Sequence, residues 1–165
     1  MEPGEALGIA AQIAVALAGF AGVVVVFRRE SVHEWSGIDR LRLRLLLANS
    51  LLPLGLSMIG LLLLTIKPVP PGLWRWCSGV AFVVSLLFAI TMTKGFRRLA
   101  LQHVQRERFT RFIFYLFGVF GIAANLLQLY NTAFLGAFWP FFSAIVLQVV
   151  TAVFQFARMV LLLPE

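Results

Sequence analysis

Polar side chains recur at helical spacing inside the last apolar stretch of the sequence. They lie at i, i+3, i+7 and i+10, and they are Gln148, Thr151, Gln155 and Arg158. On an α-helix these positions fall within an arc of about 80°. An unsatisfied amide in hydrocarbon costs several kcal/mol, so we expect the stripe to face protein or water rather than lipid.

Two other apolar stretches carry amides that could meet this stripe. Asn125 and Gln128 are one helical turn apart, and Asn49 lies in an earlier stretch. Together these residues predict a polar seam between helices. In one interpretation the seam is a hydrated path or ligand cavity, with Arg158 and the arginines of the first aqueous segment favouring anions at the inner mouth. In the other it is interhelical hydrogen bonding, worth about 0.6 kcal/mol per bond.

Residues for enzymatic or metal chemistry are scarce. Cys77 is the only cysteine, and His33 and His103 form no paired-histidine motif. The seven Asp and Glu residues lie outside the charge-free apolar runs, which argues against the carboxylate relays of proton pumps. We therefore expect a protein that is not an enzyme and holds no cofactor or metal. A weak alternative is a metal site at Glu30, His33 and Glu34, whose spacing suits one helical face.

The elements that carry these residues are predicted to be membrane-spanning helices. The 165 residues are 61% hydrophobic and 13% charged, with a mean hydropathy of +0.93, whereas a soluble domain is about 25% charged. About 20 apolar residues cross a bilayer as a helix. The charge-free run from Phe112 to Ala157 is long enough to cross twice, and its turn is expected near Tyr130 to Thr132.

We therefore expect an all-α, polytopic helical membrane protein with one domain over residues 1–165. Its five spans are predicted at about 6–27, 41–66, 73–93, 112–130 and 137–160. The alternative is four spans plus a re-entrant or interfacial helix.

Basic residues cluster in two aqueous segments, 28–40 and 94–111, and at the start of the second span. Lys and Arg in short loops stay on the cytoplasmic side, so five spans place the N-terminus outside and the C-terminus in the cytoplasm. These clusters predict contact with anionic lipid headgroups. The expected contact residues are Arg28, Arg29, Arg40, Arg42, Arg44, Lys94, Arg97, Arg98, Arg106, Arg108 and Arg111. Nucleic acid is not expected as a partner, because neither segment can form an independent fold.

The first span has two faces of interest. Small residues at four-residue intervals predict a face for close helix packing, and they are Ala10, Ala14, Ala18 and Gly22. A neighbouring face has Gln12 as its only strongly polar member, and it comprises Gly8, Gln12, Ala16, Gly19 and Val23. Several copies of this face around an axis could line a narrow pore. In the other interpretation Gln12 lies near the outer interface and meets water.

A resemblance covers about the first third of the chain. It rests on the small and apolar residues 14–24, on Glu34-Trp35-Ser36 and on the run from Asp39 to Arg44, which form a W-S-x-x-D-R-x-R-x-R core. The segment resembles a group of small bacterial multi-span inner-membrane proteins without assigned function. The resemblance implies a location in the bacterial inner membrane, and it implies no activity and no site residues.

Together these observations predict a non-enzymatic membrane protein that self-associates. Its most concrete functional form is a homo-oligomeric channel for ions or small solutes. The alternative is a structural or accessory subunit of a larger membrane complex, which would use the seam to bind a partner helix or anionic lipid.

Overall fold

A computed structural model describes residues 1–27, 37–103 and 108–161 of the chain. These residues form five α-helices and one short π-helix joined by turns. The elements are α1 (Pro3–Phe27), α2 (Gly37–Thr65), α3 (Leu73–His103), α4 (Arg108–Tyr130), η1 (Asn131–Leu135) and α5 (Phe138–Leu161). The all-α class predicted from the sequence is confirmed.

Five helices of the described chain are long and apolar enough to cross a membrane. The stretches that meet this criterion are Pro3–Val26, Asp39–Thr65, Leu73–Gly95, Tyr115–Leu135 and Phe138–Val160. Large apolar side chains on their outer surfaces are widely exposed, among them Val26 at 79%, Leu62 at 65% and Ile122 at 64%. Lipid is the solvent that suits such a surface. The prediction of an integral membrane protein with five spans is therefore confirmed.

The first span begins slightly earlier than its apolar run. We expected it to start at about residue 6, but α1 begins at Pro3. Proline suits the first position of a helix, because its fixed φ is helical and its missing N–H has no partner there in any case. Each residue of this span therefore lies three residues farther from the start of the helix than the predicted boundary implies.

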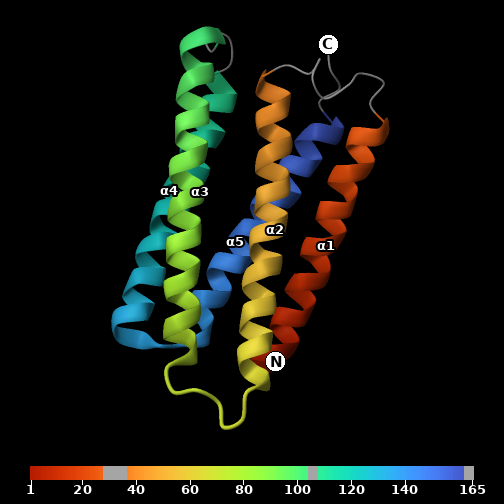
Figure 1. The fold of residues 1–165 in the computed structure, drawn as a ribbon. Helices are drawn as coiled ribbons and strands as arrows, with labels where there is room; N and C mark the ends of the chain where they lie inside the picture. Colours follow the sequence, from red (N-terminus) through yellow and green to blue (C-terminus); the bar gives the residue numbers. More distant parts are fainter. Residues whose placement is uncertain (28–36, 104–107, 162–165) are drawn as a thin grey trace.

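Successive helices run in opposite directions, so Met1 and the end of α5 lie at opposite ends of the bundle (Figure 1). α1 packs beside α2, and α3 pairs with α4. α5 crosses behind both pairs: its first turns contact α1, α2 and α3 as well as α4, and its last turns lie beside α1 and α2. It therefore packs against both pairs.

Two apolar clusters hold the helices together. The cluster at the end that carries the N-terminus joins α1, α2, α3 and α5 through residues such as Leu7, Leu56 and Phe141. The cluster toward the other end is built by α1, α2 and α5. Only 17% and 11% of the α3 and α4 spans are buried, against 28–39% for the others. The α3 and α4 helices therefore bury less of their surface in the bundle than the other three helices do.

The reversal between α4 and α5 is set by Asn131 and Gly136. η1 extends α4 by five residues, and Gly136 then adopts φ 62° while its N–H donates to the carbonyl of Asn131 at 2.9 Å. The buried Asn131 amide donates to the Ser78 hydroxyl at 2.7 Å and to the Ala137 carbonyl at 2.9 Å, and its Oδ1 accepts from the Ala137 N–H at 2.9 Å. The chain therefore turns at Gly136, a few residues after the expected position, because only glycine takes this φ without strain.

Candidate functional site

The predicted stripe on α5 faces two different sets of neighbours. The side-chain amide of Gln148 donates to the Ser85 hydroxyl of α3 at 3.2 Å. Gln155, at 6% exposure, lies between Ala152 and Met159, which belong to the cluster of α1, α2 and α5. The stripe divides in this way because Gln148 lies where α5 passes α3, whereas Gln155 lies two turns farther along α5, beside α1 and α2 (Figure 1).

The other two members of the stripe make local contacts. The Thr151 hydroxyl donates to the carbonyl of Leu147 one turn earlier, at 2.7 Å. The Arg158 guanidinium lies 5.9 Å from the centre of the Phe154 ring, a distance typical of a cation–π contact. These two side chains thus contact residues one turn earlier on α5 itself.

The amides expected opposite the stripe also bind backbone carbonyls. Asn49 donates to Leu45 at 2.8 Å, and Asn125 donates to Gly121 at 2.9 Å. Gln128 is 1% exposed and donates to the Pro140 carbonyl at 2.5 Å, across the α4–α5 turn. A carbonyl can only accept, so these contacts fix which end of each amide is the N–H₂ group.

Several side-chain oxygens of the seam are left without a donor. Among the described residues, Oδ1 of Asn125 and Oε1 of Gln128, Gln148 and Gln155 are buried and have no hydrogen-bond partner. Each of these oxygens is an acceptor that a donor from outside the described residues could satisfy.

Ser85, Asn125 and Gln148 lie at one level along the helix bundle. Asn131 bonds to Ser78, and α3 and α4 are antiparallel, so seven residues farther along each helix bring Ser85 level with residues 124–125. Gln148 bonds to Ser85 and lies ten residues into α5, or ~15 Å at 1.5 Å per residue. This depth is about half the hydrocarbon thickness. These three polar residues therefore form one polar level of the bundle, whereas Gln128 lies at the α4–α5 turn and Gln155 lies toward the other end.

The small-residue ladder of α1 is only partly buried. Ala10 and Ala14 are buried at 6% and 0%, Ala18 is half-buried and Gly22 is exposed. Four residues rotate a helix by about 400°, so a strict four-residue ladder drifts ~40° at each step. The buried side of α1 instead alternates steps of three and four through Leu7, Ala10, Ala14, Leu17 and Ala21.

Gln12 lies on the exposed side of α1. Ala21 is buried at 0%, and at nine residues from Gln12 it lies about 180° away around the helix. Of the Asn and Gln side chains whose burial the structure describes, Gln12 alone is exposed. A Cβ added at Gly8 or Gly19 would meet no atom within 4 Å. This face is therefore uncovered within one copy of the chain.

Glu5 shares the face of Gln12, which sequence inspection missed. The two residues are seven apart, so they lie within about 20° of each other around α1, and Glu5 is exposed. The spacing was visible in the sequence, but Glu5 lay outside the apolar run that we assigned to the span. We define the exposed face as Glu5, Gly8, Gln12, Ala16, Gly19 and Val23, of which Gly8 is half-buried and the others are exposed.

Only some of the predicted lipid-contacting residues can be placed. Arg40, Arg44 and Lys94 are exposed, whereas Arg42 is half-buried and its Nη1 lies 3.3 Å from Oδ1 of Asp39. The others lie outside the residues or the side chains that the structure describes, and they are Arg28, Arg29, Arg97, Arg98, Arg106, Arg108 and Arg111. The alternative metal site at Glu30, His33 and Glu34 also lies outside the described residues.

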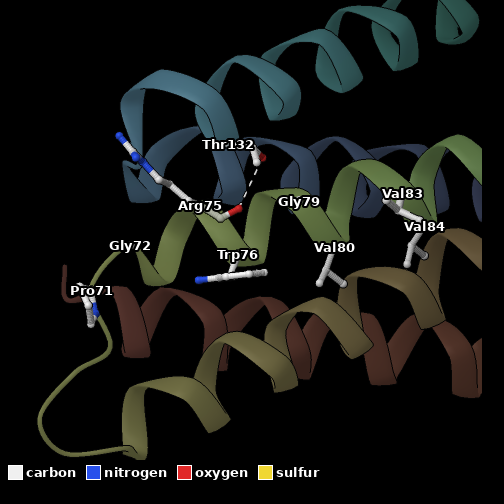
Figure 2. A pocket seen from close by; sticks show the side chains of 9 residues that line it. All are labelled: Pro71, Gly72, Arg75, Trp76, Gly79, Val80, Val83, Val84 and Thr132. Carbon is white, nitrogen blue, oxygen red and sulfur yellow. Dashed lines mark hydrogen bonds between the residues drawn. The ribbon is translucent and has the colours of Figure 1, made fainter.

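A groove of about 850 Å³ runs along α3 at the end of the bundle that carries the N-terminus (Figure 2). Arg75 and Thr132 lie along one edge, Trp76 and Val80 lie along the other, and Gly79 lies between them. The Arg75 Nη2 donates to the carbonyl of Phe134 in η1 at 3.1 Å. The sequence carries no signal for this groove, because the groove forms only where η1 lies beside α3.

Comparison of the chain with protein-family models, with curated proteins and with solved structures finds no match. The resemblance of residues 14–44 to small bacterial inner-membrane proteins therefore stays a prediction.

Proposed function

We propose that this membrane protein is a homo-oligomeric channel whose copies meet on the exposed face of α1. In this proposal the face encloses a path for cations or small polar solutes, and the protein is not an enzyme. The observation that carries the proposal is the position of Gln12, an amide directed away from its own bundle within a membrane span.

The depth of Gln12 argues for a polar partner. Gln12 lies nine residues from Pro3, or ~14 Å along a span of 24 residues. It is therefore only ~4 Å from the middle of that span. An amide facing hydrocarbon there costs several kcal/mol. A second Gln12 removes this cost, because an amide is both donor and acceptor and so pairs with its own copy.

The other residues of the face suit an axial path. Gly8, Ala16 and Gly19 are small, so helices that pack here can approach an axis closely. In a ring of copies Gln12 would form a polar constriction, and Glu5 would form a ring of carboxylates at the mouth. Carboxylate rings favour cations, so we place cations rather than anions in this path. The anion preference expected from the sequence concerns the inner mouth of the seam, which is a different part of the bundle from this face.

Cysteine cross-linking tests the contact between copies. Cys77 is the only cysteine in the sequence, so Cys77→Ala provides a cysteine-free background. Ala16→Cys in this background is expected to form disulfide-linked dimers in membranes on oxidation. Val83→Cys, exposed on α3, is the control and is expected to cross-link much less. Equal cross-linking at the two positions would contradict the proposed interface.

Gln12→Leu tests the amide itself. Loss of one interhelical hydrogen bond of ~0.6–2 kcal/mol should raise the dissociation constant of the oligomer about threefold to thirtyfold per bond. Light scattering in detergent measures the oligomeric state, and Gln12→Asn should preserve it better than Gln12→Leu. A wild-type chain that is monomeric in detergent and in native membranes would exclude the channel.

Reconstituted bilayers test conduction and its selectivity. The wild type is expected to pass cations in preference to anions, and Glu5→Gln is expected to move the reversal potential toward that of a non-selective pore. If the oligomer conducts no ion and no small solute, the contact between copies would still stand, but the proposal of a channel would be excluded. A stoichiometric companion from native membranes that displaces self-association would favour the alternative, an accessory subunit using the same face.

The setting of the channel is also part of the proposal. We place it in a bacterial cytoplasmic membrane, with the N-terminus outside, the C-terminus in the cytoplasm and the exposed Arg40, Arg44 and Lys94 on anionic headgroups. The alternating helices and the positions of the basic residues along the sequence support this orientation.

A further inference from the structure

We propose that the groove on α3 binds one phospholipid with a net negative headgroup. An acyl chain lies along the apolar length of the groove, and the phosphate contacts Arg75 at its end. This site is separate from the exposed face of α1 and does not depend on the channel.

The apolar part of the groove has the length of an acyl chain in one leaflet. Its lining extends along α3 from Gly72 to Val84, or ~18 Å at 1.5 Å per residue. One leaflet of a bilayer has a hydrocarbon depth of about 15 Å. Trp76 at 73% exposure and Val83 at 53% present apolar surface to whatever fills the groove (Figure 2).

Gly79 lies between the two edges of the groove. A Cβ at Gly79 would lie 3.7 Å from Cγ2 of Thr132, so this position brings α3 close to η1 and adds no side chain between the two edges. The Thr132 hydroxyl is already engaged, because it donates to the Gln128 carbonyl at 2.9 Å. The middle of the groove therefore offers van der Waals contact and little hydrogen bonding.

The polar end of the groove carries a positive charge. Arg75 is the only charged residue in the lining, and it lies two residues after Leu73, where the span begins. Lipid phosphates occur at this level of a bilayer, and arginine side chains reach toward them. One N–H of the guanidinium is held by the Phe134 carbonyl, and an arginine has four more to offer a phosphate.

Charge and position together identify the occupant. A groove with only apolar lining would accept an acyl chain of any surrounding lipid. This groove combines an apolar lining along α3 with the positive charge of Arg75 at the level of the lipid headgroups. A phosphate attached to an acyl chain satisfies both at once, and a net negative headgroup adds attraction to Arg75 that a zwitterionic one offsets.

Lipid titration of the full chain by native mass spectrometry tests the site. The purified protein is delipidated and titrated with phosphatidylglycerol or with phosphatidylcholine. The wild type is expected to bind one phosphatidylglycerol about fivefold more tightly than one phosphatidylcholine. Arg75→Gln should remove this preference, and Val80→Trp, which fills the groove, should weaken the binding of both lipids.

Two matched controls make the result specific. Lys67→Gln removes an exposed basic residue at the same end of the bundle but outside the lining, and Leu62→Trp adds a tryptophan to an exposed position on α2. Both are expected to bind lipid like the wild type. Arg75→Lys keeps the charge, so it should retain the preference for phosphatidylglycerol even if the contact with Phe134 weakens.

Other outcomes would overturn the proposal. Equal binding of the two lipids by the wild type, or a preference that persists in Arg75→Gln with wild-type helicity by circular dichroism, would exclude a headgroup site at Arg75. Loss of the preference in Arg75→Lys would exclude charge as its cause. Disulfide-linked dimers from Val80→Cys in the Cys77→Ala background would show that a second copy, rather than a lipid, covers the groove.

Discussion

At the scale of single residues, the side-chain amides of Asn131 and Gln128 satisfy backbone groups at the reversal between α4 and α5. Asn131 binds both the N–H and the carbonyl of Ala137, and Gln128 binds the carbonyl of Pro140. These groups lie where α4 passes into α5 and the regular helical bonds are interrupted. Asn131 and Gln128 are buried, so water does not reach these groups and side chains of the protein satisfy them.

Asn131→Ala is expected to destabilise the protein by about 1–3 kcal/mol. The substitution removes the partners of the Ala137 N–H and carbonyl and of the Ser78 hydroxyl, and an unsatisfied buried polar group costs this much. Thermal unfolding in detergent, followed by circular dichroism, measures the change. Thr93→Ala is the control, because Thr93 is exposed and bonds only within its own helix. Equal unfolding temperatures for the two variants would contradict this role of Asn131.

At the scale of elements, small residues decide how closely α1, α2 and α5 approach. A Cβ at Gly60 of α2 would lie 2.8 Å from Cδ1 of Leu7 and 3.4 Å from Cε1 of Phe141. The three helices therefore meet at a position that has no room for a large side chain. Without a hydrophobic force between helices in lipid, such close packing is a main source of their association.

Gly60→Leu should destabilise the three-helix contact by about 1–3 kcal/mol, the usual cost of overpacking. Gly55 lies in the same helix and is exposed, with no atom within 4 Å of an added Cβ. Gly55→Leu is therefore a matched control that changes helix propensity in the same way without steric conflict. Denaturation of both variants in mixed micelles gives the comparison. If Gly55→Leu proved as destabilising as Gly60→Leu, propensity rather than packing would be responsible.

At the scale of the whole molecule, an odd number of spans places the two ends of the described chain at opposite ends of the bundle (Figure 1). This arrangement depends on the reversal at Gly136, because α4 and α5 would otherwise form one helix. It also places Arg75 with the N-terminus and places Lys94 at the other end of α3.

Reporter fusions at the two termini are expected to give opposite results. A periplasmic reporter should be active at Met1 and inactive at Glu165, and a cytoplasmic reporter should show the reverse pattern. The measurement uses full-length fusions in bacterial cells. Activity of the same reporter at both ends would mean an even number of crossings and would contradict the five-span topology.

Much of the architecture could be predicted because hydrophobicity acts locally. Apolar runs such as Leu45–Ile66 are long enough to span, and the length of Phe112–Ala157 required a reversal whatever its neighbours were. The exact residues at which the helices end could not be predicted from hydrophobicity. η1 carries the chain past Tyr130, and its geometry depends on Ser78 of another helix.

Sequence alone therefore determined that the protein is helical, spans a membrane five times and carries amides in its spans. The tertiary structure decided what those amides meet: Gln148 faces Ser85, Gln155 enters the cluster of α1, α2 and α5, and Gln12 is directed away from the bundle. The physical reason is that lipid surrounds an apolar helix equally on every side. Composition thus sets insertion, whereas rotation about the helix axis depends on packing against neighbours.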